Sequence, residues 1–204
     1  MIQVKHFMDT FQVRIHGRGG QGVVTAAEVL AVAAFLEGRE AQAFPSFGSE
    51  RMGAPVMAFC RIDDKPIRLR EPISTPDAVL VQDPTLLVNA GLFAGLAPGG
   101  FVLINTEKVA GSLLLPALPS ALPPDHLVTV AAGEIARRHL GKPLPNLAML
   151  GGLLAITGIL RPESLRQAIK EKFPGRIGEA NAAAAEEAFQ VVRATSEPVA
   201  SHRS

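Results

Sequence analysis

The chain of 204 residues has no Trp or Tyr, a single cysteine and almost no net charge. With Cys60 alone it can form no internal disulfide, and it has too few thiolates for an iron–sulfur cluster or a cysteine-rich zinc site. Twenty basic and nineteen acidic side chains leave a formal charge of +1, so no global field attracts nucleic acid or an anionic membrane. The missing Trp and Tyr also remove most stacking platforms for single-stranded nucleic acid. These absences predict no nucleic-acid partner, and any bound anion must be held locally.

Long hydrophobic runs are missing as well. The most apolar stretch, residues 146–160, is interrupted by glycines and is shorter than the span of about 20 residues that crosses a bilayer. The N-terminal residues 1–10 carry charges and no long apolar core, unlike a secretory signal. We therefore expect no membrane association and a cytoplasmic, reducing compartment.

Apolar runs that read as strands alternate with helical segments over the first two thirds of the chain. The run 67–70 is the expected hairpin return of 55–63, which places that strand at a sheet edge. Four prolines make 113–125 a surface excursion or a partner-binding loop. The predicted strands are 12–17, 40–48, 55–63, 77–83, 99–106 and the start of 126–141, and the predicted helices are 20–38, 83–100, the end of 126–141, 146–160, 162–172 and 176–195.

This order of elements predicts an α/β fold. We expect a Rossmann-like, mostly parallel, doubly wound sheet with helices on both faces and a helical C-terminal segment. Residues 1–195 are predicted to form a single domain, and 196–204 to form a disordered tail.

Four glycines stand directly behind the first predicted strand, in the segment VRIHGRGGQGVVT at 13–25. A turn of this kind from a strand into a helix presents backbone N–H groups at the positive end of the helix dipole, where phosphate binds. Gly17, Gly19 and Gly22 satisfy G-x-G-x-x-G, yet its dinucleotide form needs an acid at the end of the second strand, and Glu40 begins that strand. No Lys-Ser/Thr pair follows, as a P-loop requires. An NAD-dependent dehydrogenase is therefore disfavoured.

Two polar residues within the loop favour binding over packing. The glycines alone could serve only a close approach of helix to sheet, and that alternative stays open. Arg18 and Gln21, however, are long enough to reach a ligand or a neighbouring chain, and a packing turn does not require them.

A second polar segment, FPSFGSERMGAP at 44–55, follows the second predicted strand. Ligands of open α/β sheets collect at the carboxyl ends of the strands. Ser49, Glu50 and Arg51 are therefore expected to face the glycine loop, with a solvated charged turn as the alternative.

Candidates for catalysis are few. The five histidines show no metal-ligand spacing, no G-x-S-x-G elbow is present, and Cys60 lies in an apolar strand as a core residue would. For His16 we favour a hydrogen-bonded residue at the strand end over a site residue. The sequence predicts no catalytic residue and no metal site, as in a binding subunit.

The combination of motifs resembles the gamma subunit of 2-oxoacid:ferredoxin oxidoreductases, above all of the pyruvate type. The resemblance covers about 12–189, and the paired G-x-G-G-Q-G and S-E-R-x-G motifs are far more specific than the glycine loop alone. The segments that carry it are HGRGGQGVVTAAEVLA, GSERMGAPVMAFCRI, NLAMLGGLLAITGIL and LRQAIKEKFPGRIGEANAAAAEEAF.

The resemblance implies a hetero-oligomer of alpha, beta, gamma and delta subunits. Such a complex decarboxylates a 2-oxo acid to acyl-CoA (acetyl-CoA from pyruvate) and CO₂ and reduces ferredoxin, using thiamine diphosphate, Mg²⁺, iron–sulfur clusters and coenzyme A. The gamma chain would bind none of these cofactors alone but would help to hold CoA. Two lips of that site are implied, Gly17, Arg18, Gly19, Gly20, Gln21 and Gly22 on one side and Ser49, Glu50, Arg51, Met52 and Gly53 on the other.

Several alternatives follow from the same residues. The family pattern also covers enzymes for 2-oxoglutarate, branched-chain 2-oxo acids and indolepyruvate. A stand-alone regulatory module that binds CoA or a nucleotide is the alternative from another functional class.

Overall fold

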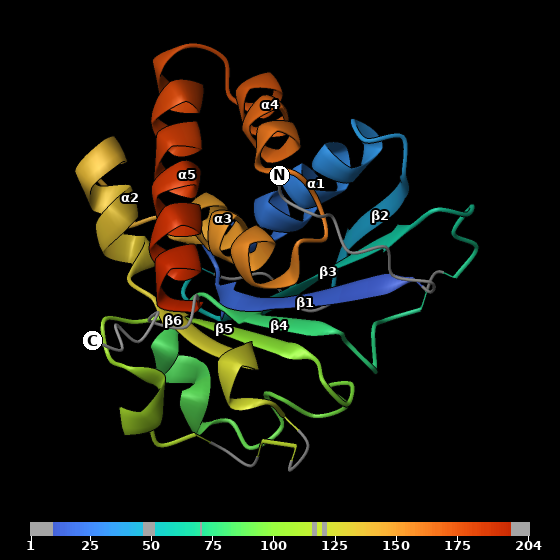
Figure 1. Ribbon diagram of the computed structural model, residues 1–204, viewed down its shortest axis with the longest axis vertical. Helices are drawn as coiled ribbons and strands as arrows, with labels where there is room; N and C mark the ends of the chain where they lie inside the picture. The colour runs from blue at the N-terminus through green and yellow to red at the C-terminus, as the bar shows by residue number, and fades with distance from the viewer. Residues whose placement is uncertain (1–9, 47–51, 70, 116–117, 120–121, 197–204) are drawn as a thin grey trace, which may run out of the picture.

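The apolar run before the glycines forms β1 (Phe11–Arg18), an inner strand of a mixed sheet (Figure 1). The computed structural model of the chain describes residues 10–46, 52–69, 71–115, 118–119 and 122–196. Within these residues the sheet has the order β2-β3-β1-β4-β5-β6. The other strands are β2 (Glu40–Pro45), β3 (Pro55–Asp63), β4 (Ala78–Val81), β5 (Phe101–Asn105) and β6 (Leu127–Val130).

Most of the sheet is the parallel part that the sequence predicts. β1, β4, β5 and β6 pair in parallel, whereas β3 runs antiparallel to both β1 and β2. β4 and the first four residues of β5 are fully buried, as expected for strands covered on both faces. The predicted α/β, Rossmann-like class is confirmed.

The position of β3 corrects one prediction. We expected 55–63 at a sheet edge, with 67–70 as its hairpin return, but β3 lies inside the sheet between β2 and β1. Residues 67–69 form no strand, and residue 70 lies outside the described part of the chain. β3 pairs with both β1 and β2, and its residues from Ala58 to Ile62 are all buried. Burial on both faces is typical of an inner strand.

The α-helices gather on one face of the sheet, as Figure 1 shows. Pro162 opens α4 at the first turn, where its missing N–H and fixed φ cost nothing. The helices are α1 (Val23–Phe35), α2 (Ala132–Leu140), α3 (Asn146–Thr157), α4 (Pro162–Lys172) and α5 (Arg176–Ser196).

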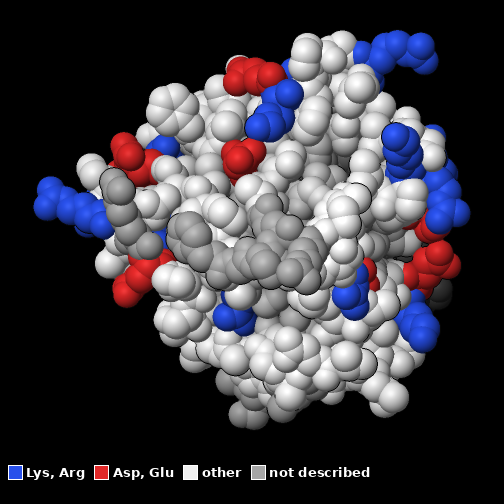
Figure 2. All heavy atoms as spheres, turned by 180° about the vertical axis from the view of Figure 1, so that it is seen from behind, with Lys and Arg blue, Asp and Glu red and all other residues white. Residues whose placement is uncertain are grey.

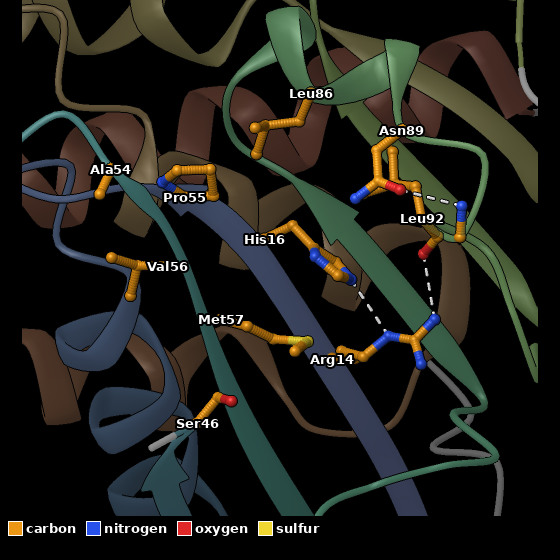
Figure 3. A pocket seen from close by; sticks show the side chains of 11 residues that line it. Arg14, His16, Ser46, Ala54, Pro55, Val56, Met57, Leu86, Asn89 and Leu92 are labelled. Carbon is orange, nitrogen blue, oxygen red and sulfur yellow. Dashed lines mark hydrogen bonds between the residues drawn. The ribbon is translucent and has the colours of Figure 1, made fainter. Parts of the chain in front are cut away.

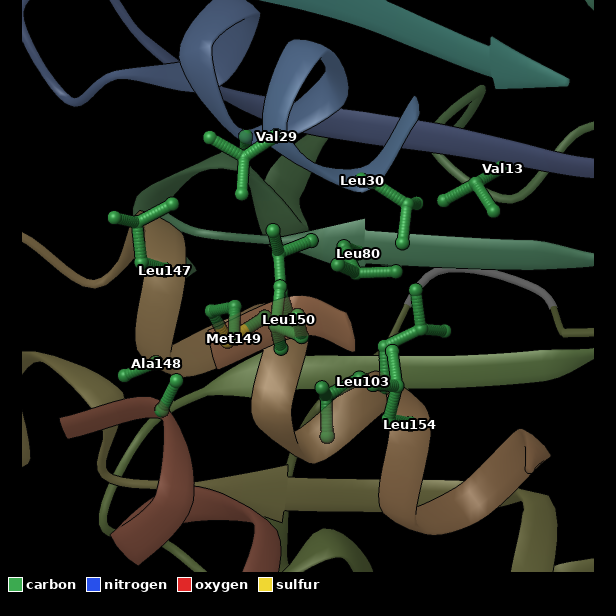
Figure 4. Packing of buried hydrophobic residues seen from close by; sticks show 14 of the residues in the cluster. Val13, Val29, Leu30, Leu80, Leu103, Leu147, Ala148, Met149, Leu150 and Leu154 are labelled. Atoms are coloured by element: carbon green, nitrogen blue, oxygen red, sulfur yellow. The ribbon is translucent and has the colours of Figure 1, made fainter. Parts of the chain in front are cut away.

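Helix α3 is the centre of this layer. It is apolar on every side and nearly all of its residues are buried, so it fills the space between the sheet, α1 and α5 (Figure 4). Two glycines let its neighbours approach closely. A Cβ on Gly151 would lie 1.9 Å from the carbonyl oxygen of Ala185 in α5, and one on Gly152 would lie 2.9 Å from Leu103 Cδ2.

The second face of the sheet is covered differently from our expectation. The α-helix predicted at 83–100 is wrong: the segment forms the 3₁₀ helix η1 (Pro84–Val88) followed by turns. Asp83 caps η1, and Asn89, Gly91 and Gly95 favour turns over a continued helix. The helices expected on both faces are therefore reduced on this face to short 3₁₀ turns.

Leucines from the proline-rich segment complete this cover. Two further 3₁₀ turns, η2 (Ala110–Ser112) and η3 (Pro124–His126), bound the segment. Four leucines of the segment, Leu113, Leu115, Leu118 and Leu122, pack against a buried cluster on this face of the sheet. The cluster includes Val79 and Val81 of β4 and Val102 and Ile104 of β5. The predicted surface excursion therefore lies against the sheet. The predicted tail, 196–204, falls outside the described residues apart from Ser196, which ends α5.

Candidate functional site

The glycine loop connects the carboxyl end of β1 to α1, and its glycines are required by both backbone and packing. Gly20 and Gly22 have φ of 93° and 69°, a region that side chains with a Cβ rarely adopt. A Cβ on Gly22 would lie 2.3 Å from the side-chain nitrogen of Asn146, which donates to the carbonyl of Gly22 at 3.3 Å. A Cβ on Gly17 would lie 2.6 Å from Val23 Cγ2. Close packing, left open by the sequence, is thus one role of these residues.

Arg18 and Gln21 hold the loop to the residue that follows β4. The backbone N–H of Arg18 donates to Gln21 Oε1 at 2.8 Å, and Gln21 Nε2 donates to Asp83 Oδ2 at 2.9 Å. The guanidinium of Arg18 lies 3.3 Å from Asp83 Oδ2 and donates to Thr85 Oγ1 at 2.7 Å. The side chains expected to reach a ligand are thus anchored inside the chain, although Arg18 keeps a third of its side chain exposed.

Asp83 is the residue of this site that sequence reasoning missed. Burial raises its pKa, but hydrogen bonds from Thr85 and Gln21 and the charge of Arg18 outweigh that effect, so the pKa lies below its usual value. A carboxylate two residues after a buried strand, at the switch point between β1 and β4, was the available signal.

The described part of the second motif, Met52 and Gly53, lies against the glycine loop. Gly19 donates to the carbonyl of Ala54 at 2.9 Å, Gly53 donates to the carbonyl of Gly19 at 3.2 Å, and Met52 pairs with Gly19 as an isolated bridge. Arg18 Nη1 donates to the carbonyl of Gly53 at 3.0 Å. The structure therefore brings Met52 and Gly53 to the loop. Ser49, Glu50 and Arg51 lie outside the described residues.

A hollow of about 440 Å³ lies where these two segments meet the start of α1. The N-cap residue of α1, Gly22, provides no side-chain hydrogen bond, and the first turn of the helix contains no acidic residue. The free N–H groups of a helix start attract anions. The lining residues are Arg18, Gly19, Gly20, Gly22, Val23, Val24, Thr25, Met52 and Val56.

His16 lies in β1 next to Arg14 and lines a second cavity (Figure 3). Arg14 Nε donates to His16 Nε2 at 3.1 Å, so the interpretation of His16 as a hydrogen-bonded strand residue fits the structure. Burial and the charge of Arg14 lower its pKa to about 3. The imidazole is therefore neutral at physiological pH and cannot act there as a general acid.

A dinucleotide site of the Rossmann kind does not fit this topology. In that fold the second strand lies beside the first, and its terminal acid reaches the ribose. Here β3 occupies that place, β2 lies one strand further out, and Glu40 is at the start of β2.

Burial raises the pKa of Cys60 to about 12, which keeps it a thiol, and no group of potential metal ligands gathers among the described residues.

Comparison with known proteins decides the family. Residues 12–191 match the pyruvate ferredoxin/flavodoxin oxidoreductase family. The chain belongs to this family. Two relatives within it are the pyruvate/ketoisovalerate oxidoreductases common subunit gamma of Thermococcus kodakarensis, 53% identical over 87% of this chain and 95% of that protein, and the pyruvate synthase subunit PorC of Methanothermobacter marburgensis, 48% identical over 89% and 97%.

A solved structure supports this placement among the pyruvate ferredoxin/flavodoxin oxidoreductases. The pyruvate oxidoreductase subunit PORC of Thermotoga maritima is 34% identical, with a TM-score of 0.74 over 89% of this chain and 96% of that one.

The surface of this family member shows no concentration of one charge on the face seen in Figure 2. Basic and acidic side chains alternate around the rim, and the lower part of that view carries few charges. In the part of the chain that the structure describes, every helix is too short or too polar to cross a membrane.

Proposed function

We propose that the chain is the gamma subunit of a multi-subunit pyruvate:ferredoxin oxidoreductase. The observation that carries the proposal is the match to a subunit named gamma over almost the full length of both chains, at 53% identity. The complex would contain alpha, beta and ferredoxin-like delta subunits, convert pyruvate and CoA to acetyl-CoA and CO₂, and pass the electrons to ferredoxin.

In this proposal, thiamine diphosphate, Mg²⁺ and the iron–sulfur clusters belong to the other subunits. The donor set of the described residues supports that division, because the single thiol, Cys60, is buried in the sheet and no group of potential metal ligands gathers among those residues. The gamma chain then contributes surface and ligand contacts rather than the reacting group.

The hollow at the glycine loop is the proposed gamma contribution to the CoA site. CoA carries a diphosphate and a 3′-phosphate, and the hollow offers the uncapped start of α1 together with the partly exposed Arg18. Both segments that the family resemblance implies for the site, Gly17–Gly22 and Ser49–Gly53, belong to this proposal.

A second candidate is one gamma subunit shared by two enzymes. Four relatives at 50% identity or more are named as the common subunit gamma of pyruvate and ketoisovalerate oxidoreductases. This chain would then also serve a branched-chain 2-oxo acid enzyme, with substrate choice made by the other subunits.

Reconstitution tests the subunit assignment. The chain is combined with its co-encoded alpha, beta and delta chains, and reduction of ferredoxin is followed with pyruvate or 2-oxoisovalerate, with and without CoA. We expect CoA-dependent turnover only when this chain is present, and none from the chain alone. Turnover by the isolated chain, or a full rate without it, would refute the assignment, and a chain that stays monomeric beside its partners would favour the stand-alone module.

The CoA site is tested by placing a carboxylate where the phosphate would bind. Thr25→Glu adds a negative charge in the first turn of α1, where an acid suits the helix dipole but repels a bound anion. Two like unit charges at an effective dielectric near 20 repel by about 1.4 kcal/mol even at about 12 Å, so we expect the KM for CoA to rise at least tenfold, with kcat unchanged.

Val32→Glu is the matched control for this experiment. It makes the same charge change at an exposed position two turns further along α1, away from the hollow. An equal effect of the two variants on the KM for CoA would place the CoA phosphates elsewhere.

A further inference from the structure

A larger cavity, of about 570 Å³, opens on the second face of the sheet beside β1 and β3. Its size is that of pockets that enclose small organic ligands. Pro55, Met57, Leu86 and Leu92 supply apolar wall, and the polar groups concentrate at one end (Figure 3).

Arg14 brings a positive charge to this end. Its side chain is 7% exposed, and it donates to His16 Nε2 at 3.1 Å and, through Nη2, to the carbonyls of Leu92 and Ala94 at 3.0 and 2.8 Å. All three partners are neutral, and no carboxylate pairs with Arg14 in the described part of the chain. A buried charge without a counter-charge is costly, so the site favours an anion.

The neighbouring polar groups are also donors. Because His16 Nε2 accepts from Arg14, the proton of the neutral ring is on Nδ1. The side-chain oxygen of Asn89 accepts from Gly91 N–H at 3.0 Å, which leaves its NH₂ group to donate. Figure 3 shows His16 between Arg14 and Asn89, with the amide nitrogen of Asn89 on the side of His16. Ser46 also lines the cavity but lies apart from these three groups, on the side of Val56 (Figure 3).

We propose that this cavity binds a small monocarboxylate that carries an apolar chain. Its carboxylate accepts from His16 Nδ1 and the amide of Asn89, with the charge of Arg14 on the other side of His16, and its apolar chain lies along Met57, Leu86 and the rest of the apolar wall. The charge of the described lining residues selects the class: Arg14 supplies one formal positive charge beside a neutral imidazole, which a monoanion balances and a phosphate dianion exceeds.

This inference goes beyond the proposed function and does not depend on it. The donors belong to Arg14, His16 and Asn89, whereas the proposed CoA contact uses the start of α1. The calorimetric test of carboxylate binding can therefore fail while the enzyme still depends on CoA through the glycine loop. Equally, the CoA proposal can fail while the carboxylate binds.

Isothermal titration calorimetry of the full chain with 4-methylpentanoate tests the site. We expect saturable 1:1 binding, binding at least tenfold weaker for the neutral 4-methylpentanamide, and binding about a hundredfold weaker for acetate, which lacks the four carbons of the apolar chain. Equal binding of the acid and the amide would show an apolar cavity only and overturn the proposal. Tighter binding of a phosphate monoester with the same chain would overturn the choice of a monocarboxylate.

Two variants place the site on these residues. Arg14→Gln removes the charge, and Asn89→Asp keeps the acceptor for Gly91 N–H but adds a built-in carboxylate opposite Arg14. Each should weaken 4-methylpentanoate at least tenfold. Because Arg14 also holds two carbonyls, Asn89→Asp decides the matter if Arg14→Gln does not fold.

Arg137→Gln is the control, since it removes an exposed cation of α2 that pairs with Glu134. We expect its affinity to stay within twofold of the wild type. Unchanged affinity in folded Asn89→Asp, or an equal loss in Arg137→Gln, would overturn the proposed site.

Discussion

At the scale of single residues, the polar side chains of the glycine loop act through partners that are distant in sequence. Arg18 and Gln21 look like ligand contacts when read alone, yet both bind Asp83, 62 residues beyond Gln21. This contact depends on β4 lying next to β1, which local pattern does not reveal. The special backbone at Gly22, in contrast, was predictable because a strand-to-helix turn needs it.

His16 makes a pH-dependent contribution to stability. Its folded pKa, about 3, lies below the unfolded value near 6.5. Between these values only the unfolded chain takes up the proton, so the free energy of unfolding falls as pH drops below 6.5. The loss from this residue between pH 7.5 and pH 5 is about 2 kcal/mol.

Urea unfolding of the wild type and of His16→Gln at the two pH values measures this contribution. Gln keeps an acceptor for Arg14 Nε but does not titrate, so the variant should lose about 2 kcal/mol less than the wild type on acidification. The same pH dependence in both proteins would contradict the lowered pKa.

At the scale of elements, sequence pattern succeeded where one physical signal dominated. The bounds of α4 follow from Pro162 at its start, and the all-round apolar character of α3 indicated a buried helix. The α-helix predicted at 83–100 was wrong because the apolar content of this segment suits any buried structure. Its turn residues, not its apolar content, determine the backbone conformation. Composition is a weaker guide than turn chemistry in such segments.

The close contact of α3 with α5 leads to a prediction about stability. Gly151→Ala would place a Cβ 1.9 Å from the carbonyl oxygen of Ala185, and rigid helix backbone cannot yield as a flexible side chain does. We expect a loss of about 1–3 kcal/mol in the free energy of unfolding, measured by urea denaturation.

Gly133→Ala in α2 is the matched control for that loss. There the added Cβ meets its nearest atom at 3.6 Å, an ordinary contact, and alanine favours a helix over glycine by up to about 1 kcal/mol. The variant should be as stable as the wild type or slightly more stable. Equal stability of both variants would mean that α5 shifts freely away from α3.

At the scale of the whole molecule, the sequence predicted a mostly parallel sheet with an α-helical layer, but neither the 3₁₀ cover of the second face nor the strand order. The parallel half β1-β4-β5-β6 follows from alternating strands and helices, whereas the insertion of β3 between β2 and β1 joins strands far apart in the chain. Candidate-site residues were predictable to the same degree. The family resemblance implied that Met52 and Gly53 share a site with the glycine loop, but Asp83 and the cavity at Arg14 required the assembled sheet.

The assembled molecule leaves two large apolar side chains exposed around the glycine loop. Met52, 87% exposed, pairs with Gly19, and Val88, 92% exposed, ends the 3₁₀ helix whose Thr85 binds Arg18. If another subunit completes the site, these two side chains are buried on assembly, each contributing about 1.5–3 kcal/mol. We therefore expect the double variant Met52→Gln and Val88→Gln to weaken binding to the other subunits at least tenfold, as measured by sedimentation.

Phe35 provides the control for this last prediction. It is 75% exposed but ends α1 at the far side from the glycine loop, about 18 Å along the helix. Phe35→Gln removes more apolar surface than either change at the loop, so a general loss of hydrophobicity would affect it most. A tenfold effect of Phe35→Gln with none from the double variant would place the subunit contact at the opposite end of α1, and the glycine loop would then face solvent in the complex.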